Sequence, residues 1–177
     1  MIRFRLLFIG LLFLFPHKLH SINISVVDID SLINNNSYYI NILKRIDDNQ
    51  KEFIQDFKQT ENKLDNLKKE IDESKIILNE VEINTMINNY NEELNIFTNL
   101  VENFNLHYQN EIIRIRKIIF EEIIVLIEKY AKNNNVDLVL DSTSYIMANN
   151  SINITNILQE ELKNIKLKLD LKKFEKN

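Results

Sequence analysis

The sequence lacks cysteine altogether and has a single glycine, Gly10, and a single proline, Pro16, among its 177 residues. Without cysteine there is no disulfide framework, so the fold must depend on a packed core or on association between chains. Without glycine beyond residue 10 the chain cannot build the glycine-rich loop that cradles phosphates, which argues against ATP use. Because neither helix-breaking residue occurs after residue 16, long uninterrupted helices are permitted.

The residues of catalytic chemistry are also scarce. His107 is the only histidine beyond residue 20, so the remaining chain offers no Cys–His pair, Ser–His–Asp triad or soft metal site. Asp137 and Asp141 flank a strand-like run, and we interpret them as solvent-facing or cap-forming rather than as an acid–base pair. We therefore predict no catalytic, metal-binding or cofactor-binding residue, and a protein that is not an enzyme.

The first 21 residues have the pattern of a secretory signal peptide. Arg3 and Arg5 form a basic start, and the apolar core from Leu6 to Phe15 is too short to span a membrane as a helix. We predict export, with cleavage near Ser21. Without Arg3, Arg5 and Lys18, the 22 basic residues fall to 19 against 26 acidic ones. This acidic balance disfavours nucleic acid as a partner.

Residues 37–133 carry a helical pattern. One helix of that length would leave its apolar stripe facing water, whereas an antiparallel hairpin would cover it. We place the turn near 81–86, where Asn84 and Thr85 are candidate caps of the returning helix. The stripe of the second helix comprises Ile87, Tyr90, Leu94, Phe97, Val101, Phe104, Tyr108, Ile112, Ile115, Ile119, Ile123, Leu126 and Tyr130.

Short strand-like runs flank this hairpin, near 22–30, 136–141 and 144–149. A hairpin returns its two ends to the same place, so these runs can pair in one small sheet. Such a sheet would expose too much apolar surface in a single chain, which favours an oligomer. The residues expected to associate are Ile24, Val26, Val27, Leu138, Val139 and Leu140.

The predicted fold is therefore α+β and mostly α. Residues 22–36 and 134–165 form a β body with a short helix from Ser151 to Leu162, residues 37–133 form the arm, and residues 166–177 form a basic tail. The tail alternates apolar and polar residues, and its secondary structure is left open.

The runs "ISVVDIDSLI" and "VDLVLDSTSYIMANNSINITNILQEEL", behind an exported N-terminus, resemble the Skp/OmpH family of periplasmic chaperones. The resemblance covers roughly residues 22–165 and is specific at the two ends. It implies a periplasmic homotrimer that holds unfolded outer-membrane β-barrel proteins, its clients, in a cavity between the arms without ATP. The residues that we expect to touch clients, or to pack the arm, are Phe53, Phe57, Tyr90, Phe97, Phe104 and Tyr108.

Two features depart from the family pattern. Family arms are commonly basic towards their tips, whereas here no Lys or Arg occurs from Ile76 to Ile113, which argues against lipid contact at the tip. The basic tail lies outside the resemblance; we expect it to be solvated, with weak membrane-surface contact as the alternative. The alternative for the whole protein is a structural or tethering coiled-coil protein of the cell envelope, anchored by an uncleaved N-terminus and by its basic tail.

Overall fold

The structure, a computed structural model, describes residues 21–175. The predicted signal peptide lies outside these residues except for Ser21. The elements, in chain order, are β1 (Ile24–Val27), α2 (Ile29–Asn34), α3 (Ser37–Ser74), α4 (Glu80–Asn134), β2 (Leu138–Asp141), the 3₁₀ turns η1 (Ser142–Ser144) and η2 (Asn150–Ile152), and α5 (Thr155–Lys163).

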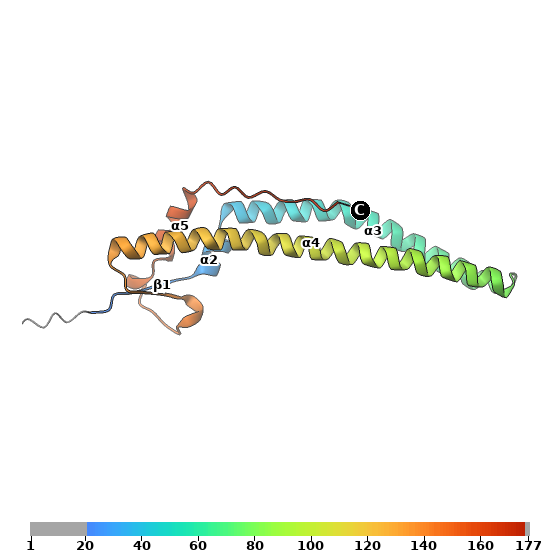
Figure 1. Ribbon diagram of the computed structural model, residues 1–177, viewed down its shortest axis with the longest axis horizontal. Coiled ribbons are helices and arrows are strands. Elements are labelled where there is room, and N and C mark those ends of the chain that lie inside the picture. The colour runs from blue at the N-terminus through green and yellow to red at the C-terminus, as the bar shows by residue number, and fades with distance from the viewer. Residues whose placement is uncertain (1–20, 176–177) are drawn as a thin grey trace, which may run out of the picture.

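Helices α3 and α4 lie antiparallel and form one long arm that leaves a small body at its root (Figure 1). Their 38 and 55 residues correspond to about 57 and 82 Å at 1.5 Å per residue. Helix α4 is the longer because its last turns continue past the start of α3 into the body. The predicted hairpin arm is confirmed.

The predicted position of the turn, near 81–86, is wrong, because α4 already begins at Glu80. The cap is Asn79, whose side chain accepts hydrogen bonds from the backbone N–H groups of Val81 and Glu82, at 3.0 and 3.1 Å. The Glu82 carboxylate in turn accepts from the Asn79 N–H, which completes a capping box. Asn84 and Thr85 lie inside the helix, and the Thr85 hydroxyl donates to the Val81 carbonyl instead of capping.

At the root, the chain turns from α4 into β2 without glycine. Asn135 adopts the left-handed conformation, with φ of 51°, and its N–H donates to the Ala131 carbonyl. The side chain of Asn23 donates to the carbonyls of Asn134 and Asn135 and so ties the start of β1 to this turn. Strand β2 then pairs in parallel with β1, with Ile24 opposite Leu138 and Val27 opposite Asp141. The predicted meeting of the two ends is confirmed.

The predicted third strand, near 144–149, is wrong. Asp141 accepts hydrogen bonds from the N–H and hydroxyl of Thr143, and this local bonding turns the chain into η1 instead of an extended strand. The loop that follows projects away from the sheet (Figure 1). The other edge of β1 is instead bridged by Asn153, beside which the Ile154 N–H donates to the Val26 carbonyl at 2.9 Å.

The core runs from the body into the base of the arm. Ile115, Ile119 and Ile123 of α4 are fully buried, as the predicted stripe requires, and Leu158 of α5 packs into the same core. The predicted helix at 151–162 begins later, at Thr155, because η2 precedes it.

The C-terminal tail is extended and runs back along the arm beside α3 (Figure 1). Leu167 and Leu171 are buried in the main core, whereas Lys168, Lys172 and Lys173 between and after them are exposed. The expectation of a solvated tail is therefore wrong for residues 166–174, because Leu167, Leu169, Leu171 and Phe174 find apolar cover on the arm.

Candidate functional site

Most of the predicted client-contact residues form one aromatic cluster near the middle of the arm. The ring centroid of Phe104 lies 5.2 Å from that of Phe53 and 5.1 Å from those of Phe57 and Tyr108. Phe97 joins the cluster through Phe57, at 5.9 Å. Separations and tilts of this kind are those of favourable aromatic pairs, worth about 0.5–1.5 kcal/mol each beyond burial.

The six predicted residues differ in accessibility. Phe104 and Tyr108 are buried beneath the other arm helix and the C-terminal tail, so one of these would have to move before a client could reach them. Phe53, Phe57, Tyr90 and Phe97 are half-buried and pack the arm while leaving part of each ring at the surface. Their role in client contact stays a prediction.

Phe97 also lines an apolar groove on the arm. Leu94, Val101 and Leu106 of α4 contribute the other apolar walls, and Glu61 of α3 faces them in a groove of about 480 Å³. Towards the tip, Ile76, Ile77 and Val81 are 90%, 84% and 75% exposed. The arm therefore offers dispersed apolar contacts along its length.

The tail covers the aromatic cluster, which sequence reasoning did not predict. The Phe174 ring lies 5.5 Å from that of Phe53, 5.4 Å from that of Phe104 and 5.6 Å from that of His107. The tail and the two arm helices thus share one apolar seam.

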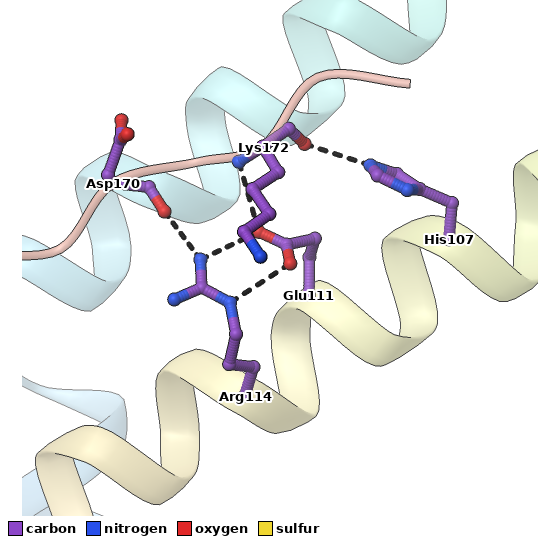
Figure 2. Close-up of polar contacts among 5 residues, drawn as sticks. All are labelled: His107, Glu111, Arg114, Asp170 and Lys172. Carbon is purple, nitrogen blue, oxygen red and sulfur yellow. Dashed lines mark hydrogen bonds and ion pairs between the residues drawn. The ribbon is translucent and has the colours of Figure 1, made fainter. Parts of the chain in front are cut away.

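Polar side chains of α4 hold the tail by its main chain (Figure 2). The Glu111 carboxylate accepts the N–H of Lys172 at 3.0 Å, and Arg114 donates to the carbonyl of Asp170. His107 Nε2 lies 2.8 Å from the Lys172 carbonyl oxygen, to which it donates in the tautomer that carries the proton on Nε2. We call His107, Glu111, Arg114 and the aromatic cluster beside them the tail groove.

Glu111 is the electrostatic centre of the tail groove. Its side chain is only 8% exposed, and the Arg114 guanidinium grips both carboxylate oxygens, at 2.9 and 2.7 Å. These hydrogen bonds, and that from the Lys172 N–H, hold the pKa of Glu111 below its usual value although burial works to raise it. The sequence held a signal for this site. Glu111 lies seven positions after Phe104 and four before Ile115, so helical spacing places this charged residue on the buried stripe of α4.

The six predicted association residues lie on both strands. Val26 and Val27 are already covered within one chain, whereas Leu138 is 44% exposed and Val139 and Leu140 are half-buried. Within residues 21–175, β2 has a strand on one side only. Beyond it, Ile146 is fully exposed and Met147 is 88% exposed on the projecting loop.

Asp141 acts as a cap, as interpreted, at the start of η1, and both aspartates also bind backbone N–H groups of the N-terminal segment. Asp137 accepts the N–H of Asn23 at 2.8 Å, and Asp141 accepts that of Ile29 at 3.1 Å, which anchors α2 to the end of β2. Burial works to raise the pKa of Asp141, but hydrogen bonds from Thr143, Ile29 and Ser142 outweigh it and leave the pKa lowered.

Residues 21–175 contain no group of three or more His, Cys, Asp or Glu side chains arranged to hold a metal ion. Among the helices in this part of the chain, none combines the length and the apolar character that a membrane crossing requires.

Comparisons with known proteins agree with this architecture. The family described as outer membrane protein (OmpH-like) matches residues 23–162, and no curated protein matches the chain. A crystal structure from Caulobacter crescentus CB15, assigned as an OmpH-like outer membrane chaperone, aligns with a TM-score of 0.65 and 12% identity over 81% of this chain and 85% of that one. At 12% sequence identity, this structural similarity shows a shared fold and nothing more. Since the family match spans most of the sequence and ends before the tail, the chain belongs, from β1 to α5, to the OmpH-like family.

Proposed function

We propose that this protein is an ATP-independent periplasmic holdase that binds unfolded outer-membrane β-barrel proteins between the arms of a homotrimer. Membership of a chaperone family supports the general class, and the arm supports the mechanism. Holding an unfolded chain requires many weak apolar contacts rather than a catalytic group. Contacts of millimolar strength combine through high effective concentration into a tight but reversible hold.

The observation that carries the proposal is that accessible apolar side chains are dispersed along an arm that projects from a small body. These side chains lie along one hairpin. They include Leu94 and Phe97, which line the apolar groove described above, and the exposed isoleucines Ile76 and Ile77 near the tip. A cavity bounded by several such arms would present these contacts from several sides. The body supports association, because β2 has an open edge and Ile146 and Met147 project beyond it.

The test of this function is suppression of aggregation. An outer-membrane barrel protein is diluted from urea into buffer, and light scattering is followed with and without the full-length protein at one trimer per client. We expect scattering to be suppressed without added nucleotide. Undiminished scattering at stoichiometric trimer contradicts the holdase function.

The tethering alternative predicts a different mature protein. A chain anchored by its N-terminus retains residues 1–21 in the cell envelope, whereas a periplasmic holdase begins near Ser21. Intact-mass measurement of the exported protein separates the two.

A further inference from the structure

We propose that the tail groove is a client-binding subsite for extended segments with alternating apolar residues, and that the protein's own tail occupies it as a tethered competitor. This inference rests on the proposed holdase function and names one place where the client binds. The tail lies outside the residues that match the family model, whereas the residues of α4 that hold it lie inside them.

The polar contacts in the tail groove carry no sequence information about the bound segment. Glu111, Arg114 and His107 bond to the main-chain groups of Asp170 and Lys172, not to their side chains (Figure 2). They lie three and four residues apart, so one face of α4 presents all three to a passing strand. Any extended segment has main-chain groups of the same kind, which is what a site for varied clients requires.

The apolar contacts select a pattern instead. Leu167 and Leu171 are buried with Leu169 half-buried between them, so alternate residues from 167 to 171 face the arm while Lys168 and Asp170 face water. Phe174 then inserts its ring against Phe53 and Phe104. Transmembrane β-barrel strands alternate apolar and polar residues with the same period of two. A client strand can therefore present the same apolar edge to the tail groove.

The tail also leaves one buried polar group poorly satisfied. The Tyr108 hydroxyl, in a side chain 1% exposed, has no hydrogen-bond partner of acceptable geometry among residues 21–175. Burial raises the pKa of this hydroxyl, and the neighbouring backbone of Phe174 only partly offsets the effect. A buried hydroxyl left wholly unpaired costs about 1–3 kcal/mol, and the poorly aligned backbone of Phe174 recovers only part of this. The tail is therefore an imperfect occupant, which a segment that bonds to Tyr108 with better geometry can displace.

The first experiment uses the wild-type protein. Amide hydrogen exchange of residues 166–174 is measured by mass spectrometry before and after addition of a urea-diluted barrel client. We expect exchange in the tail to accelerate when the client binds, because the Lys172 N–H loses Glu111. Unchanged or slower exchange with client bound contradicts displacement.

The second experiment undocks the tail in the full-length chain. Leu171→Asp combined with Phe174→Asp places two charges in the apolar seam, and Phe174→Ala is a milder variant should the double one unfold, as judged by circular dichroism. We expect client affinity to rise about tenfold, the factor expected if the tail leaves the groove free in about one molecule in ten. A tail that is only a structural strap predicts unchanged or weaker client binding and a lower Tm.

Matched substitutions on α4 then locate the subsite. In the undocked protein, Arg114→Ala should reverse the gain in client affinity, whereas Lys117→Ala, which removes an exposed charge one turn further along the same helix, should preserve it. Equal affinities for these two variants would contradict a role for the tail groove.

A labelled peptide with the sequence of residues 164–177 separates failure of this inference from failure of the holdase function. We expect the peptide to bind the undocked protein, and to bind much more weakly to wild type and to a version carrying Arg114→Ala. A peptide of the same composition with its apolar residues grouped at one end should not bind. If both peptides bind alike, the tail groove does not select alternating apolar residues, even if the protein suppresses aggregation. If the native peptide binds as expected but no barrel client does, the holdase function is contradicted while binding of extended segments in the tail groove is supported.

Discussion

At the scale of single residues, asparagine and aspartate supply the helix caps, and one asparagine takes the left-handed position after a helix that is usually glycine. Asp28, Asn36 and Asn79 cap the N-termini of α2, α3 and α4 with their side chains. Asn135 takes the one left-handed backbone conformation found among residues 21–175. A chain with no glycine after residue 10 can therefore still end and begin helices sharply.

The pKa of Glu111 predicts how the tail responds to acid. Because its folded-state pKa is lowered, the carboxylate stabilises the docked tail at pH values above the usual glutamate range, and this contribution is lost as the pH falls through the lowered value. We expect the NMR chemical shift of the Lys172 amide proton to titrate with a midpoint below that of an ordinary glutamate. In a Glu111→Gln variant this titration should disappear; its persistence would mean that another group controls the contact.

The aromatic residues show what could and could not be predicted at this scale. Phe97, Phe104 and Tyr108 lie on the helical stripe, so their place on the inner face of α4 follows from spacing alone. Their covering by Phe174 does not, because nothing local requires a tail 66 positions beyond Tyr108 to fold back onto them. That contact depends on where α5 points the chain.

At the scale of elements, the arm forms in spite of its composition. Fourteen Asn and one Ala, Ala131, lie between residues 37 and 132, and Asn is a poor helix former. Helix α4 nevertheless runs 55 residues, because Ile115, Ile119 and Ile123 and the aromatic cluster bury its stripe. Packing, not propensity, holds it.

The position of the hairpin turn yields a prediction about caps. Asn79→Ala removes both hydrogen bonds to the start of α4 and should destabilise the arm by about 1 kcal/mol. Asn84→Ala changes an exposed asparagine inside the same helix and should instead stabilise it by about 0.5 kcal/mol. Thermal unfolding followed by circular dichroism measures both. Should Asn84→Ala be the damaging substitution, the turn lies near 81–86 after all.

At the scale of the whole molecule, the body is incomplete in one chain. Its two-stranded sheet is smaller than the three or more strands that usually give a sheet independent stability. Burying Ile146 or Met147 against another chain would contribute about 1.5–3 kcal/mol for each side chain. These side chains support the proposed trimer more directly than Val26 and Val27, which are covered already.

Association can be tested at the projecting loop. Ile146→Asp places a charge where the body is expected to meet its neighbours and should lower the sedimentation mass from trimer towards monomer. Ile77→Asp makes the same change at another exposed isoleucine, at the tip of the arm, and should leave the mass unaltered. A wild-type mass of a single chain, or equal masses for both variants, would contradict association through this loop.

The sequence by itself determined the hairpin arm, the pairing of the two runs that flank it, and the family. Helical periodicity follows directly from residue order, an antiparallel hairpin brings its two ends together, and the runs at those ends carry the family resemblance. Only the tertiary structure decided three further features: the exact turn, the absence of a strand at 144–149, and the docking of the tail. For the first two, several neighbouring side chains could cap or turn the chain, and residue order does not rank them. In the folded chain Asn79 and Asp141 make these hydrogen bonds. The third depends on α5 directing the tail onto α4, where Glu111 and Phe104 of one helix meet Lys172 and Phe174 of a segment far away in sequence.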